Sequence, residues 1–362
     1  MKNRKVLLGI FIALVTILVV VAIVFTVIHS QNKNKPEANK DIVDNVAEDN
    51  KDVGNIDNVE PSEDGNVDII NIYSKTRPYA ICVNNTPVAV KVQTGLNKAY
   101  LVYEIPTEGN TSRLLALYKD LDEDLTIGTI RSARHNFIDY ALESDAIFVH
   151  YGWSHYAKDD ETAGSINFIN GLFDAPFWRE NPENLASEHT AYTSLDKIKK
   201  TVESKKFKTE SDNTILLNYN PGDVNLSNMP NVKSAKSVIV SYGNNPNVTS
   251  FIYDENNKVY NRMENNINCV DYKTKENIDT KNIIVQKITY QMCDDNYYWN
   301  LKTTGTGTGY FITNGYAVPI TWKKENRKSK TKYYYEDGTE IEVSDGRTYI
   351  EVQTTGQNLT IE

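Results

Sequence analysis

Cysteine and histidine are scarce in this sequence, which has three cysteines and five histidines in 362 residues. This excludes the dense disulfide framework that holds small secreted domains together. Hydrophobic residues make up 40% of the chain, enough for a sizeable core, and this excludes global disorder. Cys82 lies within an apolar run and is expected to be a buried core residue. If the chain is exported, three cysteines allow at most one disulfide. Cys269 and Cys293 are the more plausible pair because both lie in the C-terminal half, and the sequence leaves open whether they are joined.

No motif for a metal or a cofactor is present. His150 and His155 are five residues apart, which places them on opposite faces of a strand and matches no zinc signature. The glycine-rich run 305–309 precedes a predicted strand instead of opening a helix, so it is not a dinucleotide fingerprint. The net charge of −9 argues against nucleic acid as the main partner. The sequence carries no signal for an oligomeric state.

The charge is unevenly distributed along the chain. Residues 1–30 contain three basic side chains and no acid, whereas residues 31–70 contain four lysines and eleven acids. Residues 6–28 have no charge, and about 20 apolar residues cross a bilayer as a helix. The positive-inside rule then places residues 1–5 in the cytoplasm. We therefore predict a single-pass cell-membrane protein with its C-terminal part outside the cell. A cleaved signal peptide is the alternative, although its apolar region would be shorter.

The predicted fold class is α+β, in two domains behind this transmembrane helix. Residues 29–70 contain no aromatic side chain and are expected to form a disordered acidic tether. Residues 71–228 have the pattern of a mixed α/β domain, with short strands predicted over 78–83, 99–105 and 113–119 and helices over 133–143 and 195–203. In the second helix, Leu195, Ile198 and Val202 have helical spacing, and Ser194 is a possible N-cap. Residues 229–362 contain many short β-rich runs separated by turn signals, which predicts a mainly antiparallel β domain.

The densest polar cluster follows the predicted strand 125–130. The helix 133–143 and a strand over 146–151 would complete a β-α-β unit, with Ser132 as the N-cap of the helix. Ligands of open α/β sheets bind at the carboxyl ends of the strands. Arg131 and Arg134 lie at that edge.

We therefore expect an anion site there, because guanidinium groups and a helix N-terminus both favour carboxylate or phosphate. The predicted ligand-binding residues are Asn84, Arg113, Arg131, Ser132 and Arg134, with His150 beside them. The alternative is structural salt bridges from the arginines to Glu108, Asp139 or Asp145.

Glu104 and Glu108 suggest a second, catalytic hypothesis. Uninterrupted strand alternation would place both on one face, although Pro106 and Gly109 favour a bend. Two carboxylates, assisted by His150, suit acid–base cleavage or modification of cell-wall glycan or peptide. An ion-pair network is the alternative.

Aromatic residues are frequent in the C-terminal half. They are expected either to line a sugar-stacking groove or to fill the β core, and they are Tyr297, Tyr298, Trp299, Tyr310 and Trp322.

Several segments resemble the YerB-type lipoprotein family of Gram-positive bacteria. In the first half these are Arg77-Pro-Tyr-Ala-Ile-Cys-Val-Asn-Asn, Val102-Tyr-Glu-Ile-Pro-Thr-Glu-Gly and Ile127-Gly-Thr-Ile-Arg-Ser-Ala-Arg, and in the second half Gly307-Thr-Gly-Tyr-Phe-Ile-Thr-Asn-Gly and Asp345-Gly-Arg-Thr-Tyr-Ile. The resemblance implies a surface-anchored envelope protein with a mixed N-terminal and a β-rich C-terminal domain. It implies no reaction. No lipobox cysteine follows the apolar segment, so we expect a helical anchor instead of a lipid.

These observations predict an extracytoplasmic envelope protein that binds an anionic cell-wall polymer or peptidoglycan fragment through an arginine-rich cleft.

Overall fold

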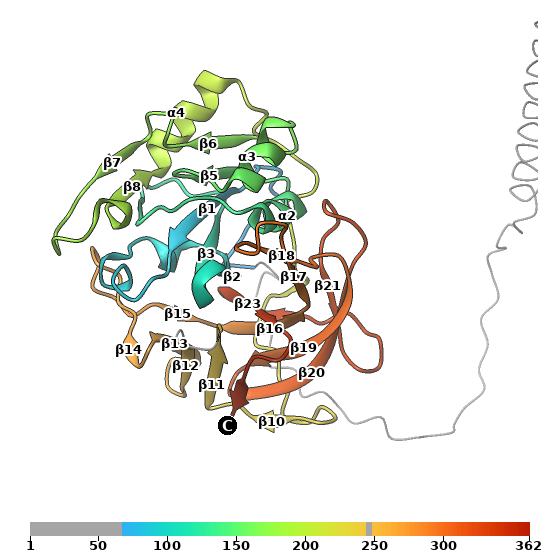
Figure 1. Ribbon diagram of the computed structural model, residues 1–362. Helices are drawn as coiled ribbons and strands as arrows, with labels where there is room; N and C mark the ends of the chain where they lie inside the picture. The colour runs from blue at the N-terminus through green and yellow to red at the C-terminus, as the bar shows by residue number, and fades with distance from the viewer. Residues whose placement is uncertain (1–66, 244–247) are drawn as a thin grey trace, which may run out of the picture. The chain divides into compact units, whose positions relative to one another are not determined.

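The structure is a computed structural model that describes residues 67–243 and 248–362 (Figure 1). The described residues belong to one compact unit. The predicted cytoplasmic stub and membrane anchor lie outside the described residues, as does the predicted tether up to residue 66. Within 67–243 and 248–362, no helix has the length and apolar character needed to cross a membrane.

The main sheet has eleven strands drawn from both halves of the chain, in the order β10-β20-β19-β16-β23-β2-β3-β1-β5-β6, with β21 beside β20. Its strands are β1 (Tyr79–Asn84), β2 (Leu101–Thr107), β3 (Thr111–Tyr118), β5 (Ile147–His150), β6 (Phe168–Asn170), β10 (Lys233–Ser234), β16 (Asn282–Ile288), β19 (Gly305–Thr313), β20 (Tyr316–Lys324), β21 (Lys332–Tyr334) and β23 (Thr348–Thr354). The two halves join at the parallel pair β2–β23, where Glu104 lies opposite Glu351. One sheet therefore extends across the predicted boundary between residues 228 and 229.

Smaller sheets complete the β structure. A six-stranded sheet contains β11 (Ser237–Ser241), β12 (Val248–Asp254), β13 (Val259–Glu264), β14 (Ile267–Asn268), β15 (Asp279–Thr280) and β24 (Leu359–Ile361). A three-stranded sheet contains β4 (Thr126–Gly128), β7 (Phe177–Arg179) and β8 (Ala191–Ser194). Two pairs remain, β17 (Tyr290–Met292) with β18 (Trp299–Leu301) and β9 (Tyr219–Asn220) with β22 (Val343–Ser344). Most pairs formed by the C-terminal half are antiparallel, as predicted.

The α-helices described are α2 (His135–Glu143), α3 (His155–Thr162) and α4 (Leu195–Lys205), and the 3₁₀ helices are η1 (Val90–Val92), η2 (Leu96–Lys98), η3 (Glu108–Asn110) and η4 (Ser187–His189). The Ser194 side chain accepts a hydrogen bond from the Lys197 amide, which confirms the predicted cap of α4. Ser132, in contrast, is not the cap of α2: the N-cap is Arg134, and the Ser132 hydroxyl donates to the Tyr151 carbonyl.

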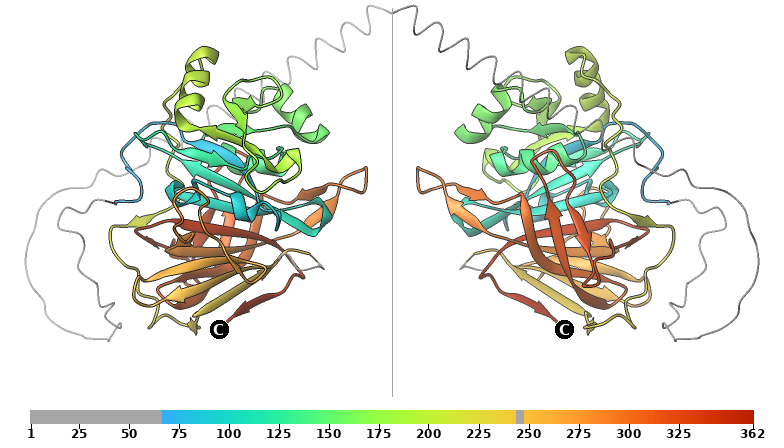
Figure 2. Two further views of the ribbon diagram at one scale, coloured as in Figure 1. Left: turned by 90° about the vertical axis from the view of Figure 1, so that its left-hand side faces the viewer. Right: turned by 90° about the vertical axis from the view of Figure 1, so that its right-hand side faces the viewer.

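The main sheet has an apolar layer on each face because its residues alternate in direction. Ala80 and Cys82 of β1 face the layer that α2 covers, and Ile81 and Val83 face the opposite layer, which α4 and the six-stranded sheet cover. In Figures 1 and 2, α3 and α4 lie at one end of the unit and the six-stranded sheet lies at the other.

The predicted β-α-β unit of residues 125–130, 133–143 and 146–151 is wrong. β4 pairs with β8 in the three-stranded sheet, whereas β5 pairs in parallel with β1 and β6. A Cβ atom at Gly128 would lie 2.3 Å from the Tyr192 ring, so the glycine permits the close pairing of β4 with β8. The parallel crossover occurs one element later, from β5 through α3 to β6.

No disulfide joins Cys269 to Cys293, the pair that the sequence favoured without settling whether it forms. Cys82, Cys269 and Cys293 are all free thiols. Cys269 is buried beside Arg262, whose guanidinium lies 3.0 Å from its sulfur, while Cys293 lies in the β17–β18 hairpin.

Candidate functional site

Three arginines come together at the carboxyl ends of β1 and β5. Arg113, in β3, lies opposite Asn84, the last residue of β1. The loop that carries the other two arginines is held against these ends by backbone hydrogen bonds, from Arg131 to the Cys82 carbonyl (3.0 Å) and from Ala133 to the Gly152 carbonyl (2.9 Å). We call Asn84, Arg113, Arg131, Arg134 and His189 the arginine site.

Arg113 is a buried cation without a carboxylate partner. Its guanidinium donates to the Ser132 carbonyl, and it forms an ion pair with no acidic side chain among the described residues. Burial, together with the charges of Arg134 and Arg131, lowers the pKa of Arg113 to about 9. An isolated buried charge is unfavourable, so an anion that neutralises Arg113 would be stabilised here.

Arg131 is only loosely paired. Its Nη1 donates to the Glu188 carbonyl (3.2 Å), and its Nη2 lies 3.7 Å from the Glu188 carboxylate, which is 58% exposed. Its Nε is buried and has no hydrogen-bond partner in the described part of the chain. Burial lowers the pKa of Arg131. A donor of this guanidinium is therefore left for another acceptor.

Arg134 is already neutralised by the protein. Its Nε donates to Glu108 Oε2 (2.8 Å) and its Nη2 donates to Glu108 Oε1, which is a bidentate pair. Burial would raise the pKa of Glu108, but Arg134 outweighs it and the pKa is lowered. The salt-bridge alternative thus holds for Arg134, which supports the site instead of offering a free charge.

His189 was missed by sequence reasoning. Its Nδ1 lies 2.8 Å from Asn84 Nδ2, so Nδ1 acts as the acceptor and the ring proton is assigned to Nε2. Burial and the charge of Arg131 lower the pKa of His189, which keeps the imidazole neutral. The hydrogen bond from the Ile130 amide to the Ala191 carbonyl (2.7 Å) holds η4 next to the site. Because this contact joins distant parts of the sequence, no local spacing of residues could predict it.

Glu104 does not join the arginine site. It faces the opposite layer of the sheet, where its carboxylate accepts from Arg262 (2.9 Å), Ser112 (2.6 Å) and Thr249 (2.7 Å) and is fully buried. Glu104 and Glu108 therefore have separate surroundings and do not converge as an acid–base pair.

His150 is also buried away from solvent. Its Nδ1 lies 2.7 Å from the Gly152 carbonyl, so Nδ1 carries a hydrogen, and its Nε2 lies 3.1 Å from Glu161 Oε1. Both side chains are completely inaccessible. His150 thus forms an internal pair instead of assisting a surface carboxylate.

A buried polar cluster surrounds Arg262 and joins the main sheet to the six-stranded sheet. We call Arg262, Glu104, Glu264 and Glu351 the Arg262 network. Arg262 Nη2 lies 2.9 Å from Glu104 and 3.1 Å from Glu264, and the Tyr242 hydroxyl donates to Glu351 (2.6 Å). Burial and the charge of Glu104 raise the pKa of Glu264 to about 8 and raise that of Glu351. Protonation of these two acids leaves one carboxylate to balance Arg262.

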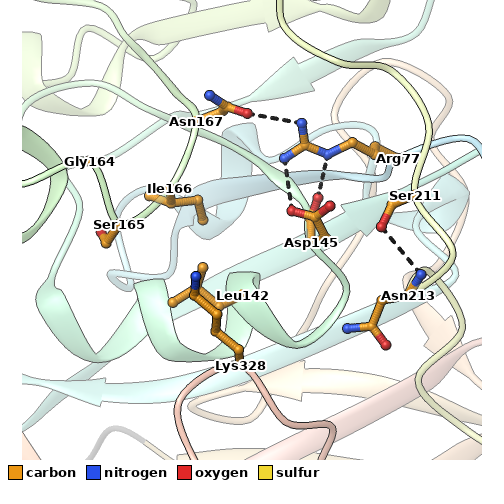
Figure 3. Close-up of a pocket in the computed structure, with 10 residues that line it drawn as sticks. All are labelled: Arg77, Leu142, Asp145, Gly164, Ser165, Ile166, Asn167, Ser211, Asn213 and Lys328. Carbon is orange, nitrogen blue, oxygen red and sulfur yellow. Dashed lines mark hydrogen bonds and ion pairs between the residues drawn. The ribbon is translucent and has the colours of Figure 1, made fainter.

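A cavity of about 300 Å³ lies at the other, amino ends of β1, β5 and β6 (Figure 3). Arg77 lines it but is fully engaged, with Nε donating to the Asp145 carbonyl (2.7 Å) and Nη1 to Asn167 (2.9 Å). Arg77 is therefore not free to bind an anion, and Lys328 is the other cationic side chain of the lining. No cluster of three or more metal-ligating side chains occurs within 67–243 and 248–362.

Comparisons with known proteins identify the family. Residues 67–208 match the "Protein of unknown function (DUF3048) N-terminal domain", and residues 238–350 match its C-terminal domain. The chain is 31% identical to the "Putative lipoprotein YerB" of Bacillus subtilis (strain 168), over 77% of this chain and 82% of that protein. The crystal structure of YerB superposes with a TM-score of 0.67 at 29% identity, covering 77% of this chain and 91% of that one. The chain therefore belongs to the DUF3048 family, which confirms the resemblance to YerB.

Proposed function

We propose that this protein binds an anionic ligand of the cell envelope at the arginine site. The observation that carries the proposal is the buried guanidinium of Arg113, which has no carboxylate partner among the described residues and lies beside Arg131, whose Nε has an unused proton. Burying the Arg113 cation without a partner is unfavourable because the charge loses its hydration. An anion that binds there would offset this cost through charge-assisted hydrogen bonds.

The charges of the site suit a ligand with one negative charge. Arg113, Arg131 and Arg134 carry three positive charges, and Glu108 and Glu188 supply two negative ones. The planar guanidinium of Arg131 favours a carboxylate or a phosphodiester, and the neutral His189 adds a donor at Nε2.

The proposed location is the outer face of the cell membrane. Two observations support it: the uncharged run of residues 6–28 behind basic residues, and the similarity to a protein whose name calls it a lipoprotein. We propose residues 6–28 as the anchor and a cell-wall polymer or peptidoglycan fragment as the ligand.

The glycan-cleaving alternative is less well supported by the geometry. Glu104 is sealed from solvent, and Glu108 is held ionised by Arg134, so neither is a free acid positioned at a surface. We therefore propose binding without cleavage.

Cosedimentation with purified Gram-positive cell wall tests the proposal. We expect Arg131→Gln to weaken binding about tenfold, because a charge-assisted hydrogen bond contributes about 1.5–3 kcal/mol. Lys328→Gln is the matched control, since it removes the same charge at an exposed position of the cavity in Figure 3. Equal wall binding by a folded Arg131→Gln variant and by the wild type would contradict the proposal.

A further inference from the structure

The β17–β18 hairpin presents aromatic rings to solvent. Tyr290 is 40% exposed and Tyr297 is 58% exposed. The rings of Tyr290 and Trp299 are stacked, with centroids 4.5 Å apart and planes inclined by 18°. Large rings usually serve the core, so a group of them on a projecting hairpin indicates a contact surface. We call Tyr290, Tyr297, Tyr298 and Trp299 the aromatic platform.

The platform is fixed directly beside the arginine site. Asn136 of α2 clamps the hairpin: its Nδ2 donates to the Trp299 carbonyl (2.6 Å) and its Oδ1 accepts from the Leu301 amide (3.0 Å). The Arg134 guanidinium lies 5.3 Å from the centroid of the Tyr298 ring. Figure 1 shows β17 and β18 next to α2.

A small cleft lies where the platform meets the arginine site. Glu108, Arg134, Tyr298 and Trp299 are among the residues that line it. Arg134 is thus the residue of the arginine site past which a bound ligand would reach the rings of the platform.

We propose that the aromatic platform stacks sugar rings, so that the ligand of the arginine site is a glycan strand bearing a carboxylate. This inference rests on the proposed function. Sugar rings have apolar C–H faces and polar edges, which suits stacking on the exposed rings of Tyr290 and Tyr297. The carboxylate supplies the single negative charge that the site requires, in the planar form that already pairs Glu108 with Arg134.

The surroundings of the platform favour a sugar over an anionic membrane. Asp294 and Asp295 are exposed in the turn of the hairpin, and carboxylates there repel acidic lipid headgroups. Asn296 and Asn300 are also exposed and offer amide groups to sugar hydroxyls.

The test compares three probes by ligand-observed NMR titration of the full chain. The first is the disaccharide of N-acetylglucosamine and N-acetylmuramic acid, whose lactyl group carries a carboxylate. The second is the N-acetylglucosamine disaccharide, which has the same sugar faces without the acid. The third is lactate, the acid without the sugar. We expect the acidic disaccharide to bind more tightly than either of the other two.

Variants then separate the two surfaces. Tyr290→Ala is expected to weaken the acidic disaccharide about fivefold and to leave lactate unchanged, because stacking on one aromatic ring contributes about 1 kcal/mol. Tyr316→Ala is the matched control: Tyr316 is 38% exposed, as Tyr290 is 40% exposed, but it lies in β20. It is expected to bind all three probes as the wild type does.

The outcomes distinguish the two proposals. If lactate binds through Arg131 but the acidic disaccharide binds no better, or Tyr290→Ala has no effect, the sugar platform is refuted and the anion site stands. If neither acid binds, the proposed function itself fails. Tighter binding of glycerol phosphate than of the acidic disaccharide would overturn the assignment of a carboxylate.

Discussion

Replacing Glu264 by glutamine is expected to remove the part that Glu264 contributes to a pH dependence of stability created by the Arg262 network. Glu264 is 2% exposed, and its Oε2 accepts from Thr249 (3.0 Å) and lies 3.1 Å from Arg262. Burial and the charge of Glu104 raise its pKa from 4.5 to about 8. The folded state therefore holds a proton at neutral pH that the unfolded state has released.

The sign follows from this difference. Because the folded pKa is raised, the stabilising contribution is complete below about pH 4.5 and is lost as the pH rises through 8. At about 1.4 kcal/mol per unit, the shift of pKa from 4.5 to about 8 corresponds to about 5 kcal/mol in all, of which about 4 kcal/mol is lost between pH 5 and pH 9. Glutamine has the shape of the protonated acid and does not titrate. The variant is thus expected to match the wild type at pH 5 to within about 1 kcal/mol and to be more stable by about 4 kcal/mol at pH 9.

Urea unfolding followed by tryptophan fluorescence at pH 5, 7 and 9 measures this difference. Glu325→Gln is the control, because it removes the same charge from a side chain that is 69% exposed, where an ion pair contributes about 0.5 kcal/mol. Parallel curves of unfolding free energy against pH for the wild type and Glu264→Gln would refute the reasoning, since the network would then hold no extra proton.

Two further predictions concern Arg262 itself and the N-cap of α4. Arg262→Met is expected to lower the unfolding free energy by about 3–5 kcal/mol, because it leaves one buried carboxylate of the network without its cation. Urea unfolding at pH 7 measures this loss, and a change below about 1 kcal/mol would contradict the assigned network. Ser194→Ala is expected to cost about 1 kcal/mol through the lost cap of α4, with Ser194→Thr retaining most of it, as thermal unfolding would show.

Local elements were predictable from the sequence because their signals are local. The cap and the buried face of α4 followed from Ser194 and from the spacing of Leu195, Ile198 and Val202. The strands β1, β2 and β3 likewise lie within about two residues of the runs that predicted them. In these segments, burial and hydrogen bonding agree with propensity.

Long-range pairing was not predictable in the same way. The spacing around residues 125–151 is long enough for a crossover, but β4 pairs with β8, whose residues follow some 60 positions later. Glu104 was predicted either to act with Glu108 as an acid or base or to join an ion-pair network, and its partner Arg262 is 158 residues away in the sequence. The spacing of residues within one segment shows which helix or strand that segment can form. Which strand or side chain it then pairs with depends on the packing of the whole chain.

The sequence predicted where the candidate site lies, but it did not predict how its charged side chains are paired. Asn84, Arg113, Arg131 and Arg134 do meet at one edge, because the loop 129–134 crosses the end of β1. Their different roles depend on long-range contacts that residue spacing does not encode. Arg134 is neutralised by Glu108, while Arg113 donates to the Ser132 carbonyl and forms no ion pair with an acid in the described part of the chain.

The NMR signals of the arginine side chains give the most direct test of anion binding at the arginine site. The sequence has nine arginines, so a sample labelled with ¹⁵N at arginine Nε gives a simple spectrum. On titration with lactate, we expect the signals of Arg113 and Arg131 to shift with a common dissociation constant. Those of Arg77 and Arg347, whose donors are occupied by the protein, should stay in place. Unchanged signals from both Arg113 and Arg131 would contradict the proposal that this site binds an anion.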